Sequence, residues 1–340
     1  MVVTVPDPED PGPAVDVVAL GNAIVDVIAY ADDAFLLAQD LDKGAMRLID
    51  AAEAERLYGA MGPAIEASGG SAANTVAGIA SFGGRAAFIG RVRDDPLGAT
   101  FGHDIRAAGV HFDVPASPDG PPTARCLILV TPDAQRTMST YLGIATHLTP
   151  DDVDADLVGR AAVTYCEGYL WDVDVAQQAI LRAMDVARVA GQRVALTLSD
   201  AFCVERHRAE FLDLTADRVD ILFANAVEIC SLYQTEHFDA ALEQVRDTCE
   251  LAFLTRGLAG SVVVAGDAVH VVDPHPPSQL VDTTGAGDLY AAGVLYGLTA
   301  GLDVPTAAAL GSLAAAEVIS HVGARPARPL AALARSAELV

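Results

Sequence analysis

The feature that most constrains the fold of this chain is a repeated alternation between short apolar runs and segments of helical length. Runs that suit buried strands lie at 161–167, 193–198, 221–224, 252–254 and 261–264, and helix-length segments such as 174–190 and 238–248 separate them. Parallel strands need a crossover between them, usually a helix, and are buried on both faces. The pattern therefore predicts an α/β fold with a mostly parallel central sheet that helices cover on both faces.

The first ninety residues extend this pattern. Short β-branched runs predict a strand at 15–20 and a second extended piece at 23–29. A glycine-rich loop at 68–74 introduces a helix that runs through Phe82, and a strand is expected at 85–90 after a Gly-Gly turn. The 23–29 piece follows the first strand so closely that it is expected to leave the core of the main sheet.

Two regions break the alternation and have the pattern of strands and hairpins. One is 31–50, and the other is 123–141, where the apolar run 126–130 precedes a Thr-Pro-Asp-Ala turn. We expect these regions to form a small β appendage on the main sheet.

The chain is predicted to contain one large domain over 15–330. The appendage is expected to be inserted into it as segments of about 27–50 and 112–146, and the acidic, proline-rich residues 1–14 are expected to form a loose arm. These N-terminal residues have neither a basic nor an apolar region typical of a signal peptide, so a cytoplasmic location is expected.

Composition excludes several classes of partner and site. The chain has 46 acidic and 21 basic residues and a formal charge of −25, which argues against binding to nucleic acids or anionic membranes. Lys43 is the only lysine, and no glycine-rich loop precedes it, so a P-loop phosphate site is excluded. The five cysteines include no C-x-x-C pair and are expected to be free thiols.

The segment 281–288 has the sequence Val-Asp-Thr-Thr-Gly-Ala-Gly-Asp and predicts a strand end, a tight turn and a helix start. Small residues at 285–287 let successive backbone N–H groups converge, and the helix dipole adds positive potential, so the turn suits an anion. Asp288 would be repelled by that anion unless it takes a proton from an attacking hydroxyl, which suggests phosphoryl transfer. An ordinary strand-to-helix turn is the alternative explanation.

The whole string from Asp282 into the helix resembles the C-terminal signature of the ribokinase-like carbohydrate and nucleoside kinases, the PfkB family. The resemblance implies a ribokinase-like fold in which the β appendage is a lid over the site, and it implies ATP and Mg²⁺ as cofactors. It assigns the general base to Asp288 and the phosphoryl-binding N–H groups to Gly285, Ala286 and Gly287. It also allows a monovalent cation near Asp282 and Thr284.

Two further patterns resemble the substrate side of the same family. Gly69-Gly70-x-x-x-Asn74 is similar to the N-terminal signature, with an amide that can bond a hydroxyl. The spacing from Asn22 to Asp26 resembles the adenosine-kinase branch, where the Asp binds ribose hydroxyls. Taken without the rest of the chain, the first pattern is a helix N-terminal loop, and the second is a turn asparagine followed by a solvated carboxylate.

Two patterns resemble the nucleotide side, and one arginine is a candidate for contact with phosphate. Asn225-x-x-Glu228 is similar to an element that arranges phosphate and magnesium, with Glu228 acting on Mg²⁺ through water, although a helix capping box has the same spacing. The loop at 255–260 resembles the ATP-side loop, although a plain hairpin also fits, and it assigns ATP contacts to Thr255, Arg256, Gly257 and Gly260. Arg136, on the expected lid, is either a cationic clamp on phosphate or a solvated arginine of a strand.

Together these patterns predict an ATP-dependent kinase. The expected acceptor is the 5′-hydroxyl of a nucleoside, with adenosine first, and a sugar kinase of the ribokinase or fructokinase kind is the alternative. The expected partners are small molecules, and both a monomer and a homodimer remain open.

Overall fold

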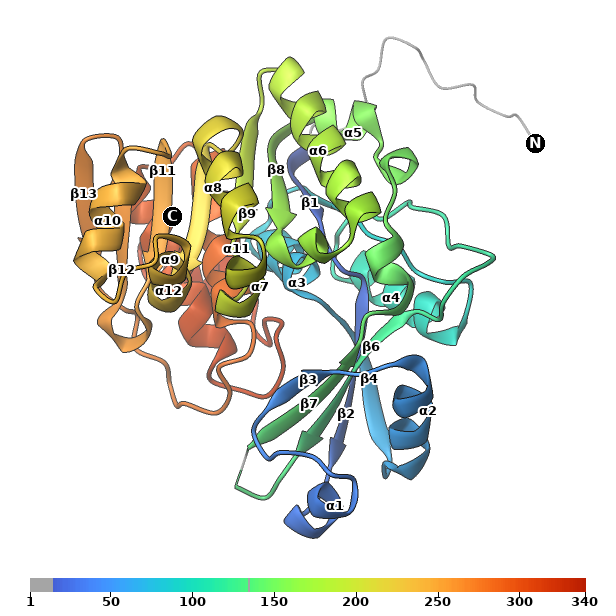
Figure 1. Ribbon diagram of the computed structural model, residues 1–340. Helices are drawn as coiled ribbons and strands as arrows, with labels where there is room; N and C mark the ends of the chain where they lie inside the picture. Colours follow the sequence, from blue (N-terminus) through green and yellow to red (C-terminus); the bar gives the residue numbers. More distant parts are fainter. Residues whose placement is uncertain (1–14, 134) are drawn as a thin grey trace.

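The structure is a computed structural model that describes residues 15–133 and 135–340 (Figure 1). The loose arm predicted at 1–14 lies outside the described residues. Among the residues described, no helix has the length and apolar character needed to cross a membrane.

The large sheet has eight strands in the spatial order β13-β12-β11-β10-β9-β8-β1-β5. All pairs from β11 to β5 are parallel, and β12 and β13 extend the sheet as antiparallel strands. The mostly parallel sheet predicted from the apolar runs is therefore confirmed. The strand bounds are β1 (Val15–Leu20), β5 (Ala86–Ile89), β8 (Ala161–Glu167), β9 (Arg193–Thr197), β10 (Ile221–Asn225), β11 (Leu251–Thr255), β12 (Ser261–Ala265) and β13 (Ala268–Val272).

Helices cover both faces of this sheet, as predicted (Figure 1). One face carries α3 (Ser71–Phe82), α4 (Pro96–Ala107), α11 (Ala286–Thr299), α12 (Val304–Val318) and α13 (Leu330–Ser336). The other face carries α5 (Ala155–Arg160), α6 (Asp174–Val189), α7 (Ala201–Arg206), α8 (Arg208–Asp217), α9 (Ala226–Leu232) and α10 (Phe238–Arg246). Val17 and Ala19 of β1 pack into the first layer, and Val18 and Leu20 pack into the second, which explains why this strand is apolar without alternation.

A second sheet of five strands projects from one end of the large sheet, at the bottom of Figure 1. Its order is β3 (Met46–Leu48), β7 (Arg136–Tyr141), β6 (Ala124–Val130), β2 (Ile24–Tyr30) and β4 (Ala64–Gly69). Residues such as Val25, Val27 and Leu127 are buried on one face, against α1 (Asp33–Ala38), α2 (Ala51–Ala60) and α4. The opposite face carries a separate cluster of Cys126, Ile128 and Val130, with Ile24, Ile28 and Met138 at its margin.

The prediction of strands and hairpins over 31–50 is wrong for Asp33–Ala38, which is helix α1. Asp32 caps that helix by accepting a hydrogen bond of 2.8 Å from the Phe35 N–H, a local signal that outweighs strand propensity. Only β3 within 31–50 is extended. The helix introduced by the 68–74 loop begins at Ser71, because Ser68 and Gly69 end β4.

The tip of the small sheet holds the single lysine. The Lys43 ammonium lies 2.7 Å from an Asp33 oxygen and 2.8 Å from an Asp133 oxygen. These contacts join α1 to the turn between β6 and β7.

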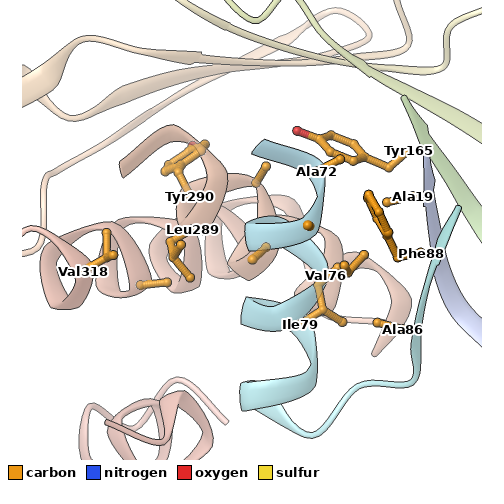
Figure 2. Packing of buried hydrophobic residues seen from close by; sticks show 14 of the residues in the cluster. Ala19, Ala72, Val76, Ile79, Ala86, Phe88, Tyr165, Leu289, Tyr290 and Val318 are labelled. Carbon is orange, nitrogen blue, oxygen red and sulfur yellow. The ribbon is translucent and has the colours of Figure 1, made fainter. Parts of the chain in front are cut away.

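Helices α3, α11 and α12 pack at unusually short range beside the sheet. Figure 2 shows Val76 and Ile79 of α3 between that helix and Phe88 and Ala86 of β5, with Leu289 of α11 nearby. Glycines allow the close helix contacts: a Cβ on Gly78 would lie 2.6 Å from the Ala292 Cβ of α11. A Cβ on Gly293 would lie 2.5 Å from the backbone of α12.

Gly293→Ala is therefore expected to lower the free energy of unfolding by about 1–3 kcal/mol, because overlap with a helix backbone cannot be relieved by a rotamer change. The gain of about 1 kcal/mol in helix propensity does not offset it. Gly59→Ala is the matched control, since Gly59 lies in α2 with no heavy atom within 4 Å of an added Cβ, and it should be stabilising. Urea unfolding of both variants tests the pair, and a stabilised Gly293→Ala protein would contradict the packing argument.

Candidate active site

The predicted site residues gather at the carboxyl ends of the parallel strands. Asn22 follows β1, Asn225 ends β10 and Thr255 ends β11. The strand order reverses at β1, because β5 lies on one side of it and β8 to β11 lie on the other. Open α/β sheets bind ligands in the crevice that such a reversal creates.

The tight turn and the helix start expected at 281–288 are present, but the strand end expected before them is not, because the described residues between β13 and α11 include no strand. The turn at 285–287 has the form of an anion-binding turn. Gly285 is the N-cap of the 14-residue helix α11 and has a left-handed φ of 77°. A Cβ at this position would lie 2.8 Å from the Ala324 carbonyl oxygen, so both conformation and space require glycine. Ala286 and Gly287 follow in the first turn, where backbone N–H groups and the helix dipole favour an anion.

Asp288 lies in the same first turn and is held from α3. One carboxylate oxygen accepts a hydrogen bond of 2.6 Å from the Ser71 hydroxyl, and the other accepts one of 3.0 Å from the Asn74 amide. Burial raises the pKa of Asp288, and these two hydrogen bonds oppose the rise. The result is an oriented carboxylate whose affinity for a proton is higher than that of a solvated aspartate.

The glycines 69 and 70 let the second sheet approach the end of β1. Gly70 has a φ of 96°, and a Cβ there would lie 2.3 Å from the Asn22 carbonyl oxygen. A Cβ on Gly69 would lie 2.5 Å from an oxygen of Asp26. The two glycines thus bring Asn22, Asp26 and the start of α3 to one place.

Asp26 projects from β2 on the face of the small sheet that carries the Cys126 cluster. Burial raises its pKa to about 6, while the positive charges of Arg325 and Arg136 oppose the rise. At neutral pH the carboxylate is therefore mostly ionised and can accept hydrogen bonds from hydroxyl groups.

Glu167 is a site residue that sequence reasoning missed. Its Oε1 accepts hydrogen bonds of 2.6 Å from both the backbone N–H and the side-chain amide of Asn22, and its Oε2 accepts one of 3.0 Å from the Ala72 N–H. Burial raises its pKa to about 7, and the bonds from Asn22 and Ala72 oppose the rise. The Asn22 Oδ1 is buried without a hydrogen-bond partner among the described residues. The only signal in the sequence was a glutamate at the end of an apolar run.

Arg136 is not a solvated arginine. Its side chain is 9% exposed and forms an ion pair of 2.7 Å with Asp282, which is 5% exposed. Its other terminal nitrogen donates a hydrogen bond of 3.3 Å to the Thr284 hydroxyl. The small sheet thus places a guanidinium beside the turn at 285–287. The monovalent cation expected near Asp282 and Thr284 stays a prediction, and it would share Asp282 with this guanidinium.

A mostly apolar cavity of about 540 Å³ borders the 285–287 turn. Its lining includes Thr255, Gly257, Gly260, Ala286, Gly287 and Tyr290, together with 274–277 and parts of α12. The segment 255–260, for which an ATP-side loop was expected and a plain hairpin was the alternative, joins the antiparallel strands β11 and β12. Arg256 does not line the cavity, because its guanidinium lies over the Phe238 ring at 5.2 Å.

Asn225 and Glu228 form a capping box at the start of α9. Asn225 Oδ1 accepts from the Glu228 N–H, and Glu228 Oε2 accepts from the Asn225 N–H, each at 2.9 Å. Burial raises the pKa of Glu228 to about 7. The part of the chain that is described contains no cluster of three His, Cys, Asp or Glu residues suited to a metal. The role of Glu228 toward magnesium, through water, stays a prediction, and its carboxylate is of the chemical type that suits this ion.

The site therefore has two compartments on either side of the 285–287 turn. Ala286 and Gly287 border the apolar cavity, whereas Asp288 faces Ser71 and Asn74 of α3. A group carried by a ligand in the cavity can thus meet the anion-binding turn from one side and an acceptor hydroxyl near Asp288 from the other. This arrangement suits in-line phosphoryl transfer.

Comparison with known families agrees with this geometry. Residues 63–331 match the family model described as pfkB family carbohydrate kinase. The chain belongs to this family. The resemblance seen in the 281–295 region and the ribokinase-like α/β fold are thereby confirmed, and the protein is a kinase that transfers a phosphoryl group.

Solved structures of pfkB relatives cover almost the whole chain. The adenosine kinase from Sinorhizobium meliloti is 53% identical, covers 96% of this chain and 100% of its own, and has a TM-score of 0.89. A probable sugar kinase from Rhizobium etli is 49% identical, covers 96% and 99%, and has a TM-score of 0.91. The adenosine kinase of Saccharomyces cerevisiae is 27% identical over 328 residues, which cover 90% of this chain and 95% of the yeast protein.

Asp288→Asn is expected to lower kcat by ~10²–10⁴ while ATP binding stays nearly intact, because the amide cannot take a proton but keeps the shape of the carboxylate. Calorimetric titration with ATP and a coupled ADP assay measure the two effects separately. Asp239→Asn is a matched control, since Asp239 is an exposed carboxylate in the first turn of α10. Near-normal turnover of Asp288→Asn would remove this residue from the mechanism.

Proposed function

We propose that this pfkB kinase transfers the γ-phosphoryl group of ATP to the 5′-hydroxyl of adenosine, giving AMP and ADP. The observation that carries the proposal is the 53% identity, over nearly the full length of both chains, to the adenosine kinase from Sinorhizobium meliloti. The acceptor side of the site, described next, supports a ribose ring with an apolar group attached to it.

On the acceptor side, the ionised Asp26 supplies two oxygens for the vicinal hydroxyls of a ribose, and the buried Asn22 Oδ1 is a further acceptor. Ile24 and Ile28 flank Asp26 along β2, Met138 lies on the same sheet face two strands away, and together they offer an apolar surface for a base. In this placement Gly69, Gly70 and Asn74 lie between the ribose and Asp288. Closure of the small sheet as a lid would exclude water that competes for the phosphoryl group.

On the donor side, the adenine and ribose of ATP occupy the cavity of about 540 Å³, with its phosphates toward the start of α11. Thr255, Gly257 and Gly260 contact the nucleotide along β11 and β12, and Asn225 lies at the phosphate end. Glu228 would hold Mg²⁺ through water, and the ion would supply positive charge on the phosphates that the single lysine of this chain cannot.

In the reaction, the 5′-oxygen of the nucleoside forms a bond to the γ-phosphorus as the bond to the bridging oxygen of ADP breaks. Asp288 takes the hydroxyl proton, so the attacking oxygen does not become positively charged. The N–H groups at 285–287 and the Arg136 guanidinium stabilise the negative charge on the transferred group.

A substrate panel separates the nucleoside from the sugar alternative, which the similarity to a probable sugar kinase keeps open. Contact with a base is worth ~1–3 kcal/mol in related stacking interactions, and about 1.4 kcal/mol corresponds to a factor of ten. Adenosine should therefore exceed free ribose by at least roughly tenfold in kcat/KM. Asp26→Ala should weaken both, because they share the ribose hydroxyls. A faster reaction with ribose or fructose than with any nucleoside would reverse the assignment and leave a sugar kinase.

Removal of divalent metal should abolish turnover. Phosphoryl transfer between highly charged groups generally needs a cation on the phosphates, and the described site offers Arg136 and backbone N–H groups in place of a lysine. The ADP assay in excess EDTA, followed by addition of MgCl₂, measures loss and recovery. Full activity in EDTA is incompatible with the proposed role of magnesium.

A further inference from the structure

Three consecutive residues after α12 each touch a different part of the active site. The Gly323 N–H donates a hydrogen bond of 3.2 Å to Asp282, the partner of Arg136. Ala324 packs directly against Gly285. Arg325 reaches α3, where its Nε donates a hydrogen bond of 3.4 Å to the Asn74 Oδ1. This short loop thus supports the anion-binding turn and reaches the residues around the acceptor hydroxyl.

The contact of Arg325 extends to the general base through a single amide. Asn74 accepts from Arg325 with its oxygen and donates to the Asp288 carboxylate with its nitrogen, at 3.0 Å. An asparagine amide can turn over and exchange these two atoms. A guanidinium has donors only, so it can bond to the Asn74 amide only when the amide oxygen faces it. In that orientation the NH₂ group must face Asp288.

Arg325 also balances the charge of Asp26. The charged groups that act on Asp26 are Arg325 and Arg136, which favour its ionised form, and Asp288 and Asp282, which oppose it. The Cys126 thiol on the neighbouring strand also lies close to Asp26. Both arginines oppose the rise in the pKa of Asp26, and Arg136 is already in contact with Asp282 and Thr284.

The guanidinium itself is in an unfavourable environment. Burial lowers the pKa of Arg325 to about 10, and the carboxylates of Asp26 and Asp104 oppose this change. It therefore stays protonated at neutral pH. Its Nη2 is buried without a hydrogen-bond partner among the residues that the structure describes, which is costly. Arg325 as a whole is half-buried, and a charge with an unsatisfied donor suits a role that an apolar side chain could not supply.

We propose that Arg325 is a positioning residue that fixes the Asn74 amide toward Asp288 and keeps Asp26 charged for the acceptor. The inference rests on the proposed function, because it assigns Asp288 to proton removal and Asp26 to the hydroxyls of the acceptor.

Arg325→Met tests this role, because methionine fills much of the same space without charge or donors. The variant is expected to lose about ten- to a hundredfold in kcat with adenosine, the effect of weakening hydrogen bonds to a charged group. KM for adenosine should rise, whereas KM for ATP should stay within about twofold, since ATP lies on the other side of the turn. Arg328→Met is the control, because Arg328 is an exposed arginine three positions along the same loop.

The pH profile separates positioning from general stability. The pKa is raised to about 6 for Asp26 and to about 7 for Glu167, and that of Asp288 is raised too, so kcat/KM for adenosine should fall as pH decreases from neutral. Loss of the Arg325 charge raises the pKa of Asp26 further, so the acidic limb should move to higher pH in Arg325→Met. Arg325→Lys keeps the charge, so it should keep the acidic limb in place while still losing kcat. This variant replaces Arg325→Met in the test if the methionine variant does not fold.

A double-mutant cycle tests the connection through Asn74. If Arg325 acts through this amide, Arg325→Met should change kcat by less than about twofold in an Asn74→Ala background. Additive losses in kcat, or an acidic limb that stays in place in Arg325→Met, overturn the proposal. The proposal is also overturned if Arg325→Met loses kcat/KM equally for adenosine and for ATP, with a lowered Tm and an unchanged acidic limb of the pH profile. A wild-type enzyme without nucleoside activity would instead overturn the proposed function.

Discussion

The contact between α3 and α11 is the constraint on which the site depends. Gly78 lets the two helices approach until a Cβ at its position would touch Leu289 and Ala292. At that distance Ser71 and Asn74, in the first turn of α3, both reach Asp288. The carboxylate is thus oriented by core packing, which is more rigid than a loop. Ser71, Asn74 and Asp288 therefore already have the arrangement that the proposed reaction uses.

The electrostatics of the site contrast with those of the whole chain. A protein with a formal charge of −25 places Asp26, Glu167 and Asp288 near a proposed triphosphate, and burial raises the pKa of each. Arg136 and Arg325 are the cations among them. Arginine suits this setting because it stays protonated when buried and its planar donors fix the direction of a neighbour. A lysine in either place would lose charge more readily on burial.

Local signals in the sequence were sufficient for much of this structure. Strands such as β8 and β10 were predicted because both of their faces are buried, and the 285–288 turn because its signature is continuous in the chain. The strand β4 was not predicted, because most of its residues are exposed and show no alternation. The capping box at Asn225 was foreseen as a local alternative and is present, while its role toward magnesium stays a prediction.

Contacts between distant parts of the chain could not be predicted in this way. Glu167 bonds Asn22 across 145 positions, and Arg325 bonds Asn74 across 251, and neither has a local pattern that marks it. The direction of a side chain in a turn could not be predicted from the sequence either. Arg256 follows β11, as the ATP-side loop requires, yet its guanidinium lies on Phe238.

The single lysine at the tip of the small sheet has a practical consequence. Lys43 is the one lysine in the sequence, so the N-terminal amine and this sheet are the two places that an acylating fluorophore would mark. The hydrogen bonds that Lys43 donates to Asp133 and Asp33 raise its pKa, so its neutral, nucleophilic form is scarce and labelling needs alkaline buffer. An emission change on addition of acceptor or nucleotide would then report the position of the sheet without any engineered cysteine.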